Sequence, residues 1–299
     1  MYIYSKNKKR MQLLLYLLLY PVLYCISILP FKILYFISDC FYVLIYRIIG
    51  YRKKTVRDNI KMALPHLSGK ERLVIEKKSF HYLCDTFLEM IKTMTISKSE
   101  INKRYVVKNL DHYLEIEKKG KSIALMTAHY ASYEWAISMN RKITFQGVGI
   151  YKKIANPYFD KLVKDIRSKF KATLITTKET KGFMEARNTD KKLCLYGFAS
   201  DQTPRLSDNN YWFTFLGIET PIHIGAEVLA KKFDLNVAFL KSKRVKRGFY
   251  EATIELLTDD ATSVPDYKIS EMFIQKVEAQ IYESPEFYLW SHKRFKHKK

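Results

Sequence analysis

Residues 110–135, LDHYLEIEKKGKSIALMTAHYASYEW, decide the fold of this chain. Apolar residues recur at helical spacing over 110–119, and the short apolar run 122–127 follows them. A helix that leads directly into a short apolar strand is the repeating unit of α/β proteins. The stretch therefore predicts an α/β fold with a mostly parallel central sheet flanked by helices.

The same alternation continues on both sides of this unit. A capping signal, Ser68 followed by Glu71, predicts a long helix that runs to about Met94 within a helical stretch 54–94. Further strands are expected at 105–107, 145–150, 173–176, 192–198, 236–240 and 252–257, and further helices at 132–141, 156–170, 178–188, 222–233 and 268–282.

The composition points to an anionic partner. The chain has 299 residues, and its 52 Lys and Arg against 30 Asp and Glu give a net charge of +22. Such a balance favours nucleic acid, anionic lipid or an acidic protein as the partner. The 22 Tyr and 18 Phe suit a membrane interface as well as RNA stacking, so composition alone leaves the choice open.

The cysteines indicate neither a disulfide framework nor a zinc site. Cys25, Cys40, Cys84 and Cys194 form no C-x-x-C pair, and the first two lie in apolar segments. A reducing compartment is expected.

The N-terminal segment predicts a membrane anchor. Residues 11–29 contain no charged side chain, and this length is close to the about 20 residues that span a bilayer. No small-residue cleavage site follows, so we expect a retained anchor and not a signal peptide. The next segment, 31–49, carries Lys32, Asp39 and Arg47, which suits a helix lying in the interface.

Basic clusters flank this apolar region on both sides, which places both flanks in the cytoplasm. A shallow hairpin and a tilted, partly inserted helix both satisfy that pattern. We expect an anchor and interfacial helix over 1–50 and a catalytic α/β domain over 51–299.

His129 and Glu134 are the candidate catalytic pair. His129 follows the strand 122–127, at the end of a strand where α/β proteins bind ligands. If Ser132 caps the next helix, Glu134 lies in its first turn and can reach the imidazole. A carboxylate beside an imidazole fixes its tautomer and makes it a candidate general base. The spacing H-x4-E alone is common and carries little weight.

Two common catalytic patterns are absent from the sequence. There is no G-x-S-x-G nucleophile elbow and no Gly-rich phosphate loop. A base would then act directly on an acceptor hydroxyl, and an activated ester would supply the acyl group in one step.

Five blocks in order resemble the late acyltransferases of lipid A biosynthesis, the lauroyl and myristoyl transferases within the glycerophosphate acyltransferase superfamily. The blocks are the stretch 56–65 (VRDNIKMALP), the H-x4-E motif, Tyr151-Lys152-Lys153 with Asn156-Pro157, Asp201-Gln202 with Phe215-Leu216-Gly217, and the ending 288–296 (YLWSHKRFK). The resemblance covers nearly the whole chain.

The resemblance implies acyl transfer from acyl carrier protein to a hydroxyl of a lipid A precursor, on the cytoplasmic face of a bacterial inner membrane. His129 would be the base and Glu134 its partner. Lys152, Lys153 and Arg167 are candidates for binding phosphate or carrier protein, and Asp201 for closing the site. No cofactor or metal is expected. An acidic carrier protein, a phosphorylated glycolipid and anionic membrane lipids all match the positive charge.

Two departures from the family pattern concern the substrates. The family's arginine in the third block is Lys152 here, which offers a point charge in place of a bidentate fork. The residues between His129 and Glu134 are Tyr-Ala-Ser-Tyr where the family often has Phe-Gly-Asn-Trp, which concerns the acceptor or the acyl chain length.

Two other functions fit part of the pattern. An acyltransferase for another lipid, such as a lysophospholipid, an aminolipid or a glycosylated phosphatidylinositol, would share the same motifs. A membrane-tethered nucleic-acid-binding protein would explain the charge, but the sequence has no helix-turn-helix, RRM-type or zinc pattern. No nucleic-acid partner is therefore expected.

Overall fold

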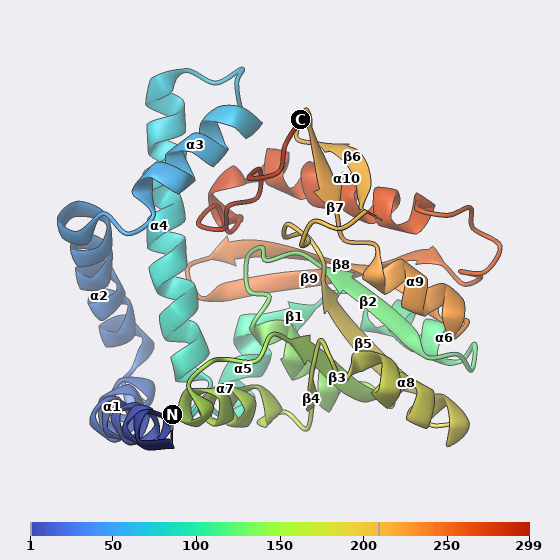
Figure 1. Cartoon of the computed structure of the whole chain (residues 1–299), viewed down its shortest axis with the longest axis horizontal. Coiled ribbons are helices and arrows are strands. Elements are labelled where there is room, and N and C mark those ends of the chain that lie inside the picture. Colours follow the sequence, from blue (N-terminus) through green and yellow to red (C-terminus); the bar gives the residue numbers. More distant parts are fainter. Residues whose placement is uncertain (1, 209) are drawn as a thin grey trace.

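A seven-stranded sheet forms the centre of the molecule. The computed structural model describes residues 2–208 and 210–299, with the backbone alone for 2–8. The strands follow the spatial order β1-β9-β8-β2-β5-β3-β4, and each neighbouring pair is parallel except β8 with β9 (Figure 1). Their bounds are β1 Tyr105–Val107, β2 Ile123–Thr127, β3 Gln146–Tyr151, β4 Thr173–Thr176, β5 Cys194–Ala199, β8 Asn236–Lys246 and β9 Phe249–Thr258. The predicted mostly parallel α/β fold is confirmed.

Helices connect the strands and cover the sheet. They are α1 Tyr2–Ile28, α2 Phe31–Tyr42, α3 Lys53–Ala63, α4 Gly69–Lys92, α5 Lys98–Arg104, α6 Leu110–Glu117, α7 Pro157–Ser168, α8 Thr180–Thr189, α9 Gly225–Lys232 and α10 Lys268–Glu283. A π-helical turn, η1 Val43–Ile49, extends α2, and two 3₁₀ segments are η2 Trp135–Arg141 and η3 Pro285–Phe287. The capping box predicted at Ser68 and Glu71 is present and starts α4.

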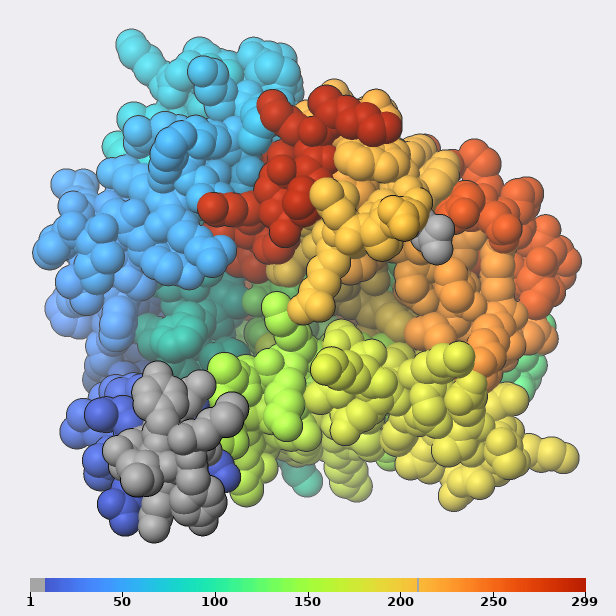
Figure 2. All heavy atoms as spheres, viewed as in Figure 1, coloured from blue at the N-terminus to red at the C-terminus, as the bar shows by residue number. Residues whose placement is uncertain are grey.

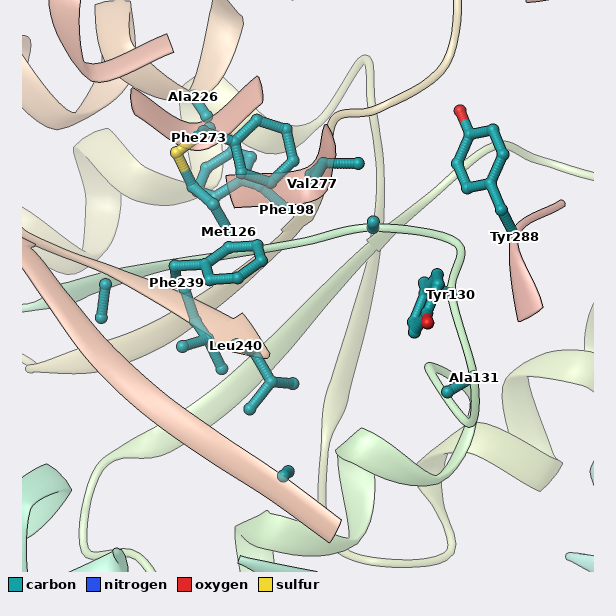
Figure 3. Close-up of a cluster of buried hydrophobic side chains, with 14 of the residues drawn as sticks. Met126, Tyr130, Ala131, Phe198, Ala226, Phe239, Leu240, Phe273, Val277 and Tyr288 are labelled. Atoms are coloured by element: carbon teal, nitrogen blue, oxygen red, sulfur yellow. The ribbon is translucent and has the colours of Figure 1, made fainter. Parts of the chain in front are cut away.

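One part of the hydrophobic core lies between the sheet and the helices α9 and α10. Met126, Phe198 and Phe239 of three neighbouring strands lie together with Phe273 and Val277 of α10, as the buried cluster in Figure 3 shows. The Phe239 and Phe273 rings meet edge to face with centroids 5.9 Å apart. Because parallel strands are covered on both faces, these strand positions read as continuous apolar runs in the sequence.

The N-terminal helices pack along the edge of this domain. Pro30 separates α1 from α2, as the sequence predicts, since proline cannot donate to a continuing helix. Helix α2 lies against α4, where Ser38 Oγ donates to Asp85 Oδ1 at 2.7 Å. At the end of α1, Lys92 of α4 donates to the carbonyls of Ser27 and Leu29 at 2.8 and 2.7 Å.

The sequence did not predict the small hairpin of β6 (Tyr211–Phe215) and β7 (Ile218–Ile222) or the short helix α5. The hairpin turns through two residues, Leu216 and Gly217, with φ of 54° and 75°. Two left-handed residues make the turn that fits the twist of a hairpin. Gly217 adopts this conformation at no steric cost, as the sequence predicted for this glycine. Leu216 has a buried side chain, and its packing holds the residue at this positive φ.

The helix expected over 132–141 differs from the prediction. It is a 3₁₀ segment that starts only at Trp135, and Ser132 does not cap it with its side chain. The loop before this segment is bound to the C-terminal region instead. Ala131, at a φ of 46°, donates from its backbone N–H to Phe287 O at 3.0 Å. The left-handed residue turns the chain away from the helical path assumed from the sequence.

Candidate active site

His129 and Asp201 lie side by side because their strands do. Strand β2 pairs with β5 in parallel register, with Thr127 opposite Ala199. His129 and Asp201 each follow two residues after these partners, so they leave the sheet at the same edge. Asp201 Oδ1 accepts from the backbone N–H of His129 at 3.1 Å and lies 2.7 Å from its Nδ1. The carboxyl edge of a parallel sheet is where α/β folds bind ligands.

The contact with Asp201 determines which nitrogen of the His129 imidazole carries the proton. Burial would raise the pKa of Asp201, but the adjacent His129 charge and its hydrogen bonds hold that pKa below its usual range. The carboxylate is thus ionised and only accepts, so in the neutral imidazole Nδ1 carries the proton and Nε2 keeps its lone pair. Burial would lower the pKa of His129, but the carboxylates of Asp201 and Glu134 raise it above 6.5.

Glu134 does not bond to His129, which corrects the contact expected from the sequence. Its carboxylate pairs with Arg167 of α7 through two hydrogen bonds of 2.5 and 2.9 Å. The turn at Ala131 and the late start of η2 direct the Glu134 side chain toward α7. Both charges stay close enough to act on the imidazole, since Glu134 raises and Arg167 lowers the pKa of His129.

The Glu134–Arg167 pair is mostly buried. The Glu134 side chain is 8% exposed and that of Arg167 25%. Burial would lower the pKa of Arg167, but Glu134 raises it far above its usual value. Bidentate geometry of this kind orients both groups as well as stabilising them. Arg167, a candidate from the sequence, therefore reaches the site through Glu134.

Lys152 and Lys153 lie at the same edge of the sheet, farther from His129. They follow β3, which is separated from β2 by β5, so the offset is about 10 Å at the usual strand spacing. Both side chains are exposed, and within the described ranges neither forms an ion pair. Hydrogen bonds with Thr176 lower the pKa of Glu179, and the charge of the nearby Lys153 lowers that pKa further.

The C-terminal segment 287–294 contacts both loops of the site, a role that sequence reasoning did not find. Leu289 donates from its backbone N–H to His129 O at 3.2 Å, and Tyr130 forms an isolated antiparallel bridge with Tyr288. Tyr130 and Tyr288 lie near each other in Figure 3. In the sequence, the stretch 288–296 stands out because it carries part of the family resemblance. The identity of its residues does not indicate which parts of the chain they contact.

The model of the bacterial lipid A biosynthesis acyltransferase family matches residues 4–297. The chain belongs to this family. It is 23% identical over 279 residues to the lipid A biosynthesis lauroyltransferase of Escherichia coli (strain K12), covering 92% of this chain and 89% of that protein. It is 23% identical over 251 residues to a lipid A biosynthesis acyltransferase of Haemophilus influenzae, covering 83% and 79%.

The family membership confirms the resemblance stated from the motifs, and it makes the protein an acyltransferase of lipid A biosynthesis. The apolar N-terminal helix α1 bears on how this acyltransferase associates with a membrane. Residues Lys9–Ile28 are long and apolar enough to cross a membrane, and only 6% of that window is buried. A core helix of a soluble protein would be mostly buried, so the exposed leucines of α1 fit membrane association.

One cavity lies away from this site in the acyltransferase. It has a volume of about 260 Å³ and is lined by residues that precede β2, β5 and β8, among them Lys121, Leu193 and Leu235. These residues lie at the amino edge of the sheet, opposite His129. The carboxyl edge is the candidate active site, because His129, Asp201, Glu134 and Arg167 meet there. Over 2–208 and 210–299, no group of three or more His, Cys, Asp or Glu side chains is placed to hold a metal ion.

Proposed function

We propose that this acyltransferase moves a fatty acyl chain from acyl carrier protein to a hydroxyl of a lipid A precursor, with His129 as the general base. The observation that carries the proposal is the 2.7 Å contact between His129 Nδ1 and Asp201, which leaves Nε2 free to accept a proton. Among the described residues Nε2 of His129 has no hydrogen-bond partner, which supports this role.

The reaction proceeds in one step. His129 Nε2 removes the proton from the acceptor hydroxyl while that oxygen attacks the carbonyl carbon of the thioester. The carbon–sulfur bond breaks, and the imidazolium returns its proton to the departing thiolate. The products are the ester and the free thiol of the carrier protein. Asp201 keeps the imidazole in the required tautomer and stabilises its protonated form.

Glu134 and Arg167 support this base as a pair. The Glu134 carboxylate adds negative potential at the imidazole, so it remains part of the catalytic site without a hydrogen bond to His129. By holding the Arg167 guanidinium through two bonds, Glu134 also fixes a cation beside the base. Such a fixed cation is suited to an anionic group of the substrate or to charge that develops on the thioester oxygen.

The two substrates meet at a basic edge of the protein. Lys152 and Lys153 are exposed beside the site, and the chain carries a net charge of +22. An acidic carrier protein and a phosphorylated glycolipid are both attracted to such a surface. The helix α1 anchors the protein in the inner membrane, and its basic flanks favour a catalytic domain on the cytoplasmic face.

An acyl-transfer assay tests the proposal. The full-length protein in detergent is incubated with acyl-acyl carrier protein and a phosphorylated lipid A precursor, and the mass of the lipid is measured by mass spectrometry. We expect a mass increase of one acyl chain. Parallel reactions offer a coenzyme A ester as donor, or a lysophospholipid as acceptor. Acylation of the lysophospholipid alone would reject the lipid A precursor as acceptor.

A further inference from the structure

The C-terminal segment 287–294 holds both loops of the site at once. On one side, Leu289 N–H donates to His129 O at 3.2 Å. On the other side, His292 Nε2 accepts from the backbone N–H of Thr203 at 3.2 Å, two residues beyond Asp201. Thr203 Oγ1 also donates to Arg294 O at 2.5 Å. The segment therefore contacts both of the loops that carry His129 and Asp201.

Asn59 of α3 anchors the middle of the segment. Its Nδ2 donates to Trp290 O at 2.8 Å and to His292 O at 2.7 Å, so both amide hydrogens are used. The side chain is 3% exposed. In Figure 2 the C-terminal segment, in red, lies between the light blue region that contains α3 and the gold β6–β7 hairpin. One buried amide thus fixes the carbonyls on either side of the turn at Ser291.

We infer that Asn59 is a positioning residue, which holds His129 against Asp201 by fixing the C-terminal segment that contacts both of their loops. The inference rests on the proposed role of His129 as base. A buried carbonyl that loses its donor is left without a partner for its lone pairs, so the turn rearranges when both donors are removed. The carbonyl of His129 and the amide of Thr203 then lose partners of fixed position.

Asn59→Leu tests this role, with Asn109→Leu as the matched control. Leucine keeps the branching of asparagine at Cγ and donates nothing. Asn109 also makes two hydrogen bonds, donating to Ile254 O at 2.7 Å and accepting from Ile254 N at 2.9 Å. It follows β1, three strands away from β2 in the sheet. The two variants lose the same number of bonds, one set beside the site and the other far from it.

Two measurements on the full-length protein separate positioning from stability. In the acyl-transfer assay, we expect Asn59→Leu to lower kcat at least tenfold with KM changed less than twofold, and Asn109→Leu to change neither beyond twofold. In an NMR titration, with His129→Gln used to assign the signal, we expect the pKa of His129 to fall in Asn59→Leu only. The acid limb of kcat moves to lower pH with it.

The inference is overturned if Asn59→Leu and Asn109→Leu give the same kcat and the same His129 titration. The NMR readout needs no turnover, so a wild-type protein without acyl transfer would refute the proposed function and leave the inference testable. If Asn59→Leu does not fold, Asn59→Ala replaces it, because that change removes both donors and adds no bulk. An unchanged His129 pKa in Asn59→Ala would then overturn the inference.

Discussion

One oxygen of Asp201 accepts from both the imidazole Nδ1 and the backbone N–H of His129, at 2.7 and 3.1 Å. Two contacts to a single oxygen fix the ring and its loop together. Asp201 is 1% exposed, and its second oxygen, Oδ2, has no partner among the described residues. Among the described residues, His129 is therefore the only hydrogen-bond partner of the Asp201 carboxylate.

Replacing His129 should abolish acyl transfer while the fold is kept. His129 lies on a loop and its side chain is 20% exposed, so His129→Gln removes the base without opening the core. A general base contributes about 10²–10⁴ to the rate. We expect at least a hundredfold loss in kcat by the mass-spectrometric assay, with an unchanged circular dichroism spectrum. A rate within threefold of wild type would rule out His129 as the base.

Replacing Asp201 by asparagine should lower both the rate and the pKa of His129. In Asp201→Asn the amide oxygen can still accept from Nδ1, but the negative charge that raises the His129 pKa is gone. We expect about a tenfold to hundredfold loss in kcat/KM, and an acid limb that moves to lower pH. A limb that stays at the wild-type pH would show that Asp201 does not act on His129 through its charge.

Activity and the contribution of His129 to stability should respond to pH in opposite directions. The pKa of His129 is raised above 6.5, so its stabilisation is present below pH 6.5 and is lost as pH rises through the folded pKa. The pKa of Asp201 is lowered, so its contribution is present above pH 3.8 and is lost as pH falls through its folded pKa.

The base must be neutral to accept a proton, so kcat/KM should rise with pH through the same His129 pKa, with a midpoint above pH 6.5. The check is a pH–rate profile beside thermal melts of wild type and His129→Gln. The difference in Tm between the two proteins should shrink as pH rises past that midpoint. A midpoint below pH 6.5 would contradict the raised pKa.

Removing the carboxylate of Glu134 should destabilise the protein and slow it. Glu134→Gln leaves the Arg167 guanidinium, 25% exposed, without its charged partner. We expect a loss of about 1–3 kcal/mol in the free energy of unfolding and at least a tenfold lower kcat.

Asp165→Asn is the matched control for Glu134→Gln, because it breaks the exposed Lys161–Asp165 pair on the same helix α7. Exposed pairs of this kind contribute about 0–1 kcal/mol, so little change is expected in either quantity. Chemical denaturation and the acyl-transfer assay measure the two effects. Equal effects of the two variants would argue against a special role for Glu134.

Acidic substitutions on α1 should detach the protein from membranes. Leu14 and Leu18 are 63% and 70% exposed and lie four residues apart on one side of the helix. Leu14→Glu with Leu18→Glu should reduce binding to vesicles containing anionic lipid at least tenfold in a sedimentation assay. Val228→Glu, at a 54% exposed position on α9, should bind as wild type. Equal binding by all three proteins would exclude α1 as the anchor.

Local sequence patterns determined most of the elements of this protein. The period of the apolar residues predicted the strands of the parallel sheet, because a buried strand and an amphipathic helix each require a particular spacing. The capping box at Ser68 and the break at Pro30 predicted helix boundaries, since both act through groups a few residues away. The β6–β7 hairpin was not predicted, because it lies outside the strand–helix alternation of the main sheet.

The tertiary structure decided which carboxylate meets His129. From spacing, Glu134 was the natural partner, being five residues away, and Asp201, 72 residues away, was a separate candidate. The adjacency of β2 and β5 brings Asp201 to the imidazole, while the turn at Ala131 sends Glu134 to Arg167. Periodicity and capping are local properties of a sequence, but the order of strands in a sheet follows from the packing of the whole chain. That order, together with the turn at Ala131, set the geometry of the base.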